Sequence, residues 1–207
     1  LRESVFIMLF FYKFKEGKME YLKEKILKDG KIKEGGILKV DSFLNHQIDV
    51  NCLNEIGKEF KRRFSDVKVN KILTIESSGI AVAAIAAQYF NSPVVFAKKV
   101  ESKNLDNETY EAEVYSYTKD KTYTIRVSKK YLNENDKILV VDDFLARGSA
   151  ALGLLEIVNQ SKAEVAGVGI VIEKNFQEGG KKLRENGIRL ESLARVEFDQ
   201  EDNILFI

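Results

Sequence analysis

The sequence predicts a single α/β domain whose central sheet is mostly parallel and flanked by helices, and three segments support this prediction. Residues 71–97 read as strand, turn, apolar helix and strand, which is the repeating unit of a parallel α/β fold. Residues 138–141, Ile-Leu-Val-Val, form a short apolar run typical of a buried parallel strand. Residues 165–173 form a second such run, thinned by glycine. A chain of 207 residues is long enough to enclose this sheet in a full hydrophobic core.

The segment before the first predicted strand indicates two helices separated by an irregular stretch. The first helix would begin near residue 19, with one apolar face formed by Tyr21, Leu22, Ile26 and Leu27. Residues 37–49 follow neither the helical nor the strand period, so we expect a loop-rich segment there. The second helix has an apolar stripe with charged residues around it, formed by Leu53, Ile56, Phe60 and Phe64.

The remaining predicted helices and strands are also typical of an α/β fold. Residues 80–90 are almost wholly apolar, so this helix should be covered on several sides. Residues 112–117 and 122–127 alternate between apolar and polar side chains, which predicts two antiparallel strands joined at 118–121. A helix should follow residue 148, with an apolar face formed by Ala151, Leu154, Leu155 and Val158. Residues 179–187 predict a short helix that Gly187 ends.

Residues 1–18 are expected to be a translated leader, so that the domain proper covers 19–207. Residues 5–12 are strongly apolar but fall short of the roughly 20 residues that span a bilayer. No small-residue cleavage site follows them, so they do not resemble a secretory signal. Met19 opens a good amphipathic helix, and the codons of Lys15, Glu16 and Gly17 can spell a bacterial ribosome-binding sequence.

Composition excludes several classes of function. Lys and Arg number 33 against 32 Asp and Glu, so no overall positive field would attract nucleic acid or a membrane surface. With one cysteine, Cys52, and one histidine, His46, the chain has no internal disulfide and is a poor candidate for a protein-ligated metal site. It also offers little for a Cys-His or Ser-His-Asp arrangement. A reducing cytoplasm suits this composition best.

The stretch 138–150, ILVVDDFLARGSA, carries the functional signal. In open α/β sheets, ligands bind beyond the carboxyl ends of strands, where Asp142 and Asp143 are expected. Gly148 would let the backbone approach a ligand, and the N–H groups at the following helix start would hold an anion. Because the carboxylates could accept hydrogen bonds from vicinal hydroxyls, the pattern indicates a ribose 5-phosphate site. The alternative is a capping Asp142, a solvated Asp143 and a tight turn, but the agreement of strand, acid pair, glycine and helix favours a site.

The same stretch resembles the phosphoribosyl pyrophosphate (PRPP) signature of type I phosphoribosyltransferases. Further blocks, in order along the chain, resemble bacterial xanthine phosphoribosyltransferases: 38–49, 74–81, 114–119, 167–179 and 191–195. The resemblance implies the type I fold with a small N-terminal hood-like segment, a homodimer, and purine salvage. The implied reaction converts xanthine and PRPP into xanthosine 5′-monophosphate and pyrophosphate, with Mg²⁺ bound mainly through PRPP.

The resemblance also assigns roles to residues. Asp142 and Asp143 would face the ribose hydroxyls as the catalytic acids. The 5-phosphate loop would be formed by Ala146, Arg147, Gly148, Ser149 and Ala150. The purine would be contacted by Leu38, Asn45 and Lys174; the plain alternatives are a loop-capping residue for Asn45 and a solvated strand end for Lys174. The loop departs from the family pattern because Arg147 stands where an asparagine is usual, and because Ala150 lacks the hydroxyl of the threonine that related loops carry.

Two further groups are candidates for the pyrophosphate. Ser77, Ser78 and Gly79 follow a predicted strand and could contact it, or could equally form a simple helix cap. Lys98 and Lys99 follow the next strand and could contribute charge, or be a solvated pair.

Three other functions stay open at this point. The nearest is a hypoxanthine–guanine or adenine phosphoribosyltransferase. A PRPP-sensing regulatory protein without turnover would need a DNA-binding module, for which residues 19–36 are too short and too balanced in charge. The third is a plain sugar-phosphate-binding protein.

Overall fold

The computed structural model describes residues 19–33, 37–99, 108–116, 120–201 and 203–207. The segment 1–18, expected to be a leader, lies outside the described residues. In the part of the chain that is described, no helix is long and apolar enough to cross a membrane.

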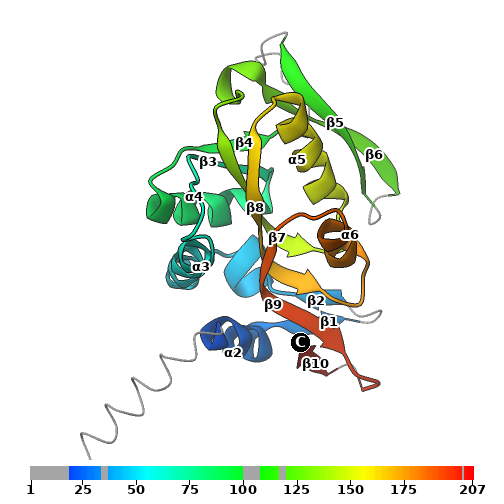
Figure 1. Ribbon diagram of the computed structural model, residues 1–207. Coiled ribbons are helices and arrows are strands. Elements are labelled where there is room, and N and C mark those ends of the chain that lie inside the picture. The colour runs from blue at the N-terminus through cyan, green and yellow to red at the C-terminus, as the bar shows by residue number, and fades with distance from the viewer. Residues whose placement is uncertain (1–18, 34–36, 100–107, 117–119, 202) are drawn as a thin grey trace, which may run out of the picture.

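A six-stranded sheet forms the centre of the molecule and confirms the predicted α/β fold (Figure 1). Its strand order is β10-β9-β8-β7-β3-β4, and every neighbouring pair is parallel except β10 with β9. The strands are β3 (Lys71–Ile75), β4 (Val94–Ala97), β7 (Lys137–Leu145), β8 (Glu164–Lys174), β9 (Leu190–Phe198) and β10 (Ile204–Phe206).

Alternating residues of the central strand β7 divide the interior into two cores. Leu139 and Val141 pack with α3 (Val50–Arg63) and α4 (Ser78–Phe90) on one face of the sheet. Ile138 and Val140 pack with α5 (Ser149–Gln160) and the hairpin of β5 (Thr109–Ser116) and β6 (Lys121–Ser128) on the other face. This alternation follows from the two-residue period of a strand, and it explains why both faces of the run 138–141 are apolar. Figure 1 shows α3 and α4 on one side of the sheet and α5 and α6 (Gly179–Glu185) on the other.

The first face is covered by α3 (Val50–Arg63) and α4 (Ser78–Phe90). The predicted stripe of α3 is confirmed, since the four side chains predicted for it are all fully buried. The side chain of Asp49 begins this helix by accepting a hydrogen bond from the Cys52 N–H at 3.1 Å. The expectation that the apolar helix is covered on several sides is only partly met, because Ala84 and Gln88 of α4 are exposed.

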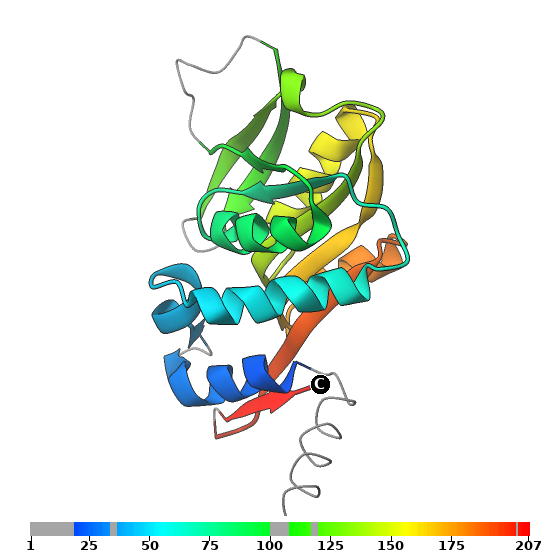
Figure 2. The same cartoon turned by 90° about the vertical axis from the view of Figure 1, so that its left-hand side faces the viewer.

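The N-terminal segment forms a small hood beside β9 and β10 (Figure 2). It consists of α2 (Glu20–Asp29), β1 (Lys31–Lys33), β2 (Ile37–Lys39) and a π-helical turn, η1 (Asp41–Asn45). The prediction for α2 is corrected in one respect: Leu22 and Ile26 are buried, whereas Tyr21 and Leu27 are exposed. The four residues of the predicted apolar face spread around more of the helix than its neighbours cover, so only two of them are buried. The loop-rich prediction for 37–49 was too coarse, because β2 and η1 lie within it.

The hairpin predicted from alternation is confirmed as β5 (Thr109–Ser116) and β6 (Lys121–Ser128), and residues 117–119 lie outside the described part. It packs against α5 (Ser149–Gln160), where a Cβ on Gly153 would lie 2.6 Å from the Val114 side chain. The last helix, α6 (Gly179–Glu185), ends as predicted before Gly187, which adopts a positive φ of 72°.

Candidate active site

A cleft of about 650 Å³ opens at the carboxyl ends of the parallel strands. Its floor is the segment that joins β7 to α5, and the hairpin supplies Tyr115, Ser116 and Tyr123 to one wall. Lys174, at the end of β8, and Ile37 from the hood also line it. The hairpin side chains were not among the predicted site residues, because nothing local in the sequence places that hairpin over the strand ends.

The paired acids lie within β7 and not beyond it, which corrects the predicted strand end at residue 141. The strand continues to Leu145 because β8 remains paired beside it, with Asp142 opposite Ile170 and Phe144 opposite Ile172. Asp142 and Asp143 are each 6% exposed. The alternative of a solvated Asp143 therefore fails.

The two carboxylates reach different parts of the site. Asp142 Oδ1 accepts the Asp143 N–H at 2.9 Å and lies near the start of α4, where a Cβ on Gly79 would come within 2.8 Å of it. The Thr74 hydroxyl is beside that glycine, is buried, and has no hydrogen-bond partner among the described residues. Asp143 Oδ2 accepts a weak hydrogen bond from the Asn45 side-chain amide at 3.5 Å. The acids thus connect the β3–α4 turn with the hood.

The electrostatics of this pair favour a ligand that donates hydrogen bonds or brings positive charge. Burial, and next the charge of Asp143, raise the pKa of Asp142 well above its ordinary value, while Lys99 opposes them. Burial and the Asp142 charge also raise the pKa of Tyr123. The Lys99 ammonium lies 5.3 Å from the centre of the Tyr123 ring. Beyond the hydrogen bonds from the Asp143 N–H and Asn45, an acid pair kept from water is stabilised further by a bound molecule that donates hydrogen bonds or by a cation.

The loop between β7 and α5 has the form of an anion cradle. Gly148 adopts a φ of 85°, a conformation that side-chain-bearing residues rarely take. Helix α5 begins at Ser149, and no side chain caps its first N–H groups in the described structure. Loop residues 146–150 all line the cleft. Unpaired N–H groups at the start of a helix of 12 residues favour a bound phosphate.

The three residues matched to the purine occupy different environments. Lys174 lines the cleft, its ammonium lies 5.3 Å from the Phe144 ring centre, and burial lowers its pKa. Asn45 ends η1 and reaches Asp143. The Leu38 side chain is buried in the core at 4% exposure, while its neighbour Ile37 faces the cleft at 49% exposure.

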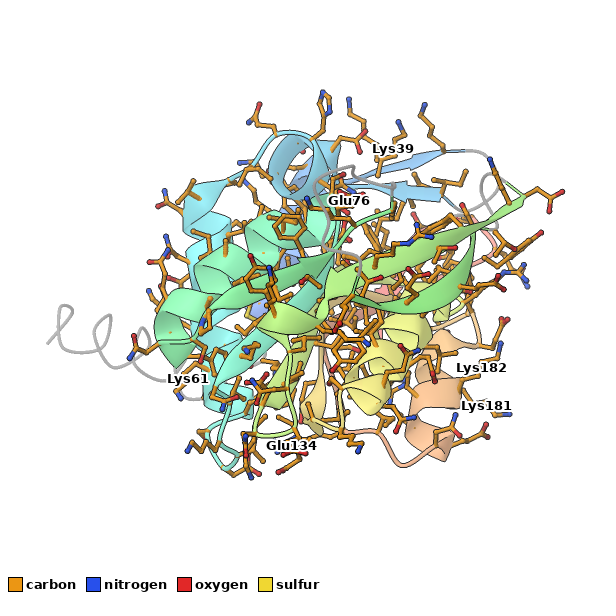
Figure 3. All side chains as sticks on the ribbon, turned by 90° about the horizontal axis from the view of Figure 1, so that it is seen from above. Lys39, Lys61, Glu76, Glu134, Lys181 and Lys182 are labelled. Atoms are coloured by element: carbon orange, nitrogen blue, oxygen red, sulfur yellow. The ribbon has the colours of Figure 1, made fainter. Side chains whose placement is uncertain are left out.

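The residues considered for the pyrophosphate lie at the two neighbouring strand ends. Ser77 precedes α4 but its side chain makes no capping hydrogen bond, so the simple-cap alternative is not supported for this residue. The Glu76 carboxylate, labelled in Figure 3, accepts the Lys99 N–H. Lys98 exchanges backbone hydrogen bonds with Arg126 of the hairpin. Lys99 is therefore held between the β3–α4 turn and the hairpin, close enough to act on the pKa of Asp142.

Comparison with known proteins agrees with this geometry. Residues 44–190 match the phosphoribosyl transferase domain family. The xanthine phosphoribosyltransferase of Clostridium novyi is 60% identical over 188 residues, covering 91% of this chain and 99% of that protein. That of Alkaliphilus metalliredigens is 62% identical over 188 residues, covering 91% of this chain and 93% of that protein.

Solved structures show the same fold at much lower identity. The adenine phosphoribosyltransferase of Trypanosoma brucei, in complex with AMP, pyrophosphate and ribose-5-phosphate, superposes with a TM-score of 0.71 at 17% identity, covering 84% of this chain and 79% of that one. The Saccharomyces cerevisiae adenine enzyme gives a TM-score of 0.68 at 23% identity, with coverage of 84% and 98%.

Proposed function

Since this chain belongs to the phosphoribosyltransferase family, and within it to the xanthine phosphoribosyltransferases, we propose that it is a purine salvage enzyme that transfers the 5-phosphoribosyl group of PRPP to xanthine. The products are xanthosine 5′-monophosphate and pyrophosphate. The observation that carries the proposal is the buried pair Asp142–Asp143 in β7, which leads directly into the cleft-lining residues Phe144 to Gly148 of the predicted phosphate loop.

The roles of the acids and the loop follow from their surroundings. Asp142 and Asp143 accept hydrogen bonds from the ribose hydroxyls, and the backbone N–H groups of residues 146–150 hold the 5-phosphate. Breaking the bond from ribose C1 to pyrophosphate builds positive charge on the sugar, which negative carboxylates below the ring stabilise. The purine nitrogen then attacks C1. This chemistry depends on positioning and charge stabilisation, so the chain needs no histidine or thiol at the site.

Mg²⁺ fits the donors of this site. Two adjacent, buried carboxylates attract a cation that prefers oxygen ligands, and such an ion commonly keeps few protein ligands beside substrate phosphates. Asp142 and Asp143 would hold the ribose and, through it, a cation bound mainly by PRPP. When bound, the ion neutralises charge on the departing pyrophosphate. Ser77, Ser78, Gly79 and Lys99 stand at the adjacent strand ends, where they would receive that group.

For the purine, Lys174 and Asn45 have separate tasks. The Lys174 ammonium donates to the C6 carbonyl, which xanthine, hypoxanthine and guanine share. Asn45 donates its side-chain amide to the C2 oxygen, which distinguishes xanthine. Because the Leu38 side chain is packed in the core, any contact with the base falls to its backbone or to Ile37.

Asn45→Leu should lower kcat/KM for xanthine far more than for hypoxanthine. Asn45 is exposed in the ligand-free chain, but a base bound over it would cover its amide, and an unsuitable base would leave that amide unpaired. We expect a loss of roughly five- to tenfold for xanthine, given about 1–1.5 kcal/mol for the lost bond. Steady-state kinetics with both purines checks this, and an equal loss for the two would remove Asn45 from the specificity role.

Arg147→Asn places the usual family residue in the phosphate loop. If the backbone N–H groups carry the phosphate, the substitution should change the KM for PRPP only modestly and leave purine choice unaltered. Initial rates at varied PRPP test this. A hundredfold loss of activity, about 2.7 kcal/mol, would instead make the Arg147 guanidinium a main ligand.

The function itself is tested by pyrophosphate release from PRPP with xanthine, hypoxanthine, guanine and adenine supplied in turn. We expect turnover with xanthine at the highest kcat/KM. A preference for another purine would reassign the substrate, and binding of PRPP without any purine-dependent release would favour a sensor.

We also propose that the enzyme is a cytoplasmic homodimer. Its single cysteine, Cys52, is buried and suits a reducing compartment. Strand β4 lies at an edge of the sheet, and Phe96 on it is exposed, so this side offers a surface for a second copy. Sedimentation velocity measures the oligomeric state, and a monomer at micromolar concentration would contradict the assembly.

A further inference from the structure

An ion pair with a buried carboxylate and a partly exposed guanidinium lies next to the phosphate loop but outside the cleft lining. Glu173 on β8 is 1% exposed, and its two carboxylate oxygens each accept a hydrogen bond of 2.7 Å from the Arg184 guanidinium of α6. Ser192 on β9 donates its hydroxyl to the same carboxylate at 2.5 Å. Burial alone would raise the pKa of Glu173, but the bonds from Arg184 and Ser192 outweigh it and lower that pKa. The pair is therefore charged and bidentate.

The first turn of α6 rests directly on this pair. A Cβ on Gly180 would lie 1.9 Å from Glu173 Oε1 and 2.6 Å from Arg184 Nη1. At such distances, any side chain on residue 180 would displace the Glu173 carboxylate or the Arg184 guanidinium. The ion pair therefore fixes how closely α6 approaches β8.

The preceding glycine meets the phosphate loop. The Gly179 N–H donates to the Ala146 carbonyl at 3.0 Å. A Cβ on Gly179 would lie 2.4 Å from that oxygen and 2.7 Å from the Gly148 nitrogen. Conversely, a Cβ on Gly148 would lie 3.1 Å from the Gly179 Cα. Two consecutive glycines thus place the ion pair on one side of the helix start and the loop on the other.

The pairing of β7 with β8 also brings the ion pair close to the phosphate loop. Glu173 pairs with Leu145, the last residue of β7 before the loop, and is followed directly by Lys174 of the cleft. The ion pair is therefore within a few ångströms of backbone that leads into both the phosphate loop and the purine side of the cleft.

We infer that Glu173 and Arg184 are positioning residues, which hold α6 so that Gly179 keeps loop 146–150 in the shape that binds the 5-phosphate. The inference rests on the proposed PRPP site. An ion pair with one buried partner adds little net stability, but its bidentate geometry is fixed. Stability and PRPP affinity should therefore separate in suitable variants.

Three variants make that separation measurable, with PRPP and Mg²⁺ titrated by calorimetry and Tm recorded for each. Arg184→Met removes both bidentate bonds and leaves the Glu173 carboxylate with the Ser192 hydroxyl and the Arg195 guanidinium, whose Nε lies 3.7 Å away, so it should lower Tm and raise the Kd for PRPP by roughly tenfold or more. Adding Glu173→Gln removes the buried charge that has lost its main partner, so Tm should recover while the Kd stays raised. Gly180→Ala keeps every charge but inserts a methyl group against the pair, and it should also raise the Kd. The KM for xanthine at saturating PRPP should change least in all three.

Lys181→Met is the matched control on the same helix. Lys181 pairs with Glu185 at 3.7 Å, and both side chains are largely exposed. In Figure 3, Lys181 and Lys182 extend outward from α6. An exposed pair of this kind contributes little, so Tm and the Kd for PRPP should stay at wild-type values.

The outcomes separate a failure of the positioning role from a failure of the proposed function. If wild type and Lys181→Met bind PRPP and the double variant recovers both Tm and Kd, the pair is structural only and the inference is wrong. The inference is also wrong if Gly180→Ala binds PRPP like wild type. If wild type itself binds no PRPP, the proposed function is wrong, and this inference, which rests on it, is wrong as well.

Discussion

Replacing both acids, Asp142→Asn together with Asp143→Asn, should remove most turnover while the fold stays intact. Each substitution weakens charge-assisted hydrogen bonds to a ribose hydroxyl, worth roughly 1.5–3 kcal/mol apiece. It also removes negative charge from beneath a sugar that becomes positive in the transition state. Because the two side chains are neighbours, the losses need not add. The measurement is kcat/KM for PRPP, and a near-normal value would remove the acids from the ribose site.

Stability should move in the opposite direction from activity. Burial and the Asp143 charge hold the pKa of Asp142 higher in the folded chain than in the unfolded one. This group therefore favours folding at acid pH, and its contribution is lost as the pH rises from the ordinary carboxyl value through the raised one. Asp142→Asn removes that loss, so the ligand-free variant should match or exceed the wild-type Tm at neutral pH. A marked fall in Tm would contradict this explanation of the pair.

Asp136→Asn is the control for replacing a buried acid elsewhere. Asp136 is also 6% exposed, but it lies before β7 and bonds the Lys71 ammonium at 2.8 Å. Its replacement should lower Tm and leave kcat/KM of the folded enzyme unchanged. The contrast separates the loss of a buried charge at the proposed ribose site from the loss of a buried charge elsewhere.

Lys174→Met should lower kcat/KM for xanthine and hypoxanthine together. The lost ammonium is a charged donor to the shared C6 carbonyl, so the expected penalty is roughly 1.5–3 kcal/mol for both bases. Methionine keeps the apolar contact with Phe144. Burial lowers the pKa of Lys174, so the wild-type advantage over the variant should fall at a pH below the ordinary lysine value. Taking the ratio of the two enzymes at each pH cancels the ionisation of the purine.

Lys137→Met provides the matched lysine control at the opposite end of the sheet. Lys137 begins β7 and pairs with Glu164 at 2.7 Å, with both side chains well exposed. Its loss should alter neither purine's kinetics. If Lys174→Met instead lowers kcat/KM for xanthine alone, the contact with the C2 oxygen belongs to Lys174 and not to Asn45.

Much of the fold could be predicted because apolar runs mark strands buried on both faces. The run 138–141 identified β7, but residues 142–145 were not predicted to belong to the strand, because two adjacent acids resemble the end of a strand. Strand β9 was missed for a related reason. Its Glu191 and Arg195 break the apolar pattern, and only the folded chain shows that Arg63 and Glu173 lie beside them. Charges paired between distant segments leave no local signal.

The site residues also fall into two groups, those that a single stretch of sequence predicts and those that it does not. The acid pair and Gly148 could be predicted from one stretch, because strand, carboxylates and loop are contiguous there. Lys174 and Asn45 depended on resemblance to a family, since neither stands out in its own segment. The wall formed by Tyr115 and Tyr123 depends on where the hairpin docks, which a two-residue period does not encode.

The most direct test of the central claim is the product balance of a reaction containing the enzyme, PRPP, Mg²⁺ and xanthine. Xanthosine 5′-monophosphate and pyrophosphate, measured together over the initial phase, should appear in equal amounts, and the variant lacking both acids should form little of either. Pyrophosphate appearing without the nucleotide, or the nucleotide formed equally well by that variant, would contradict the claim.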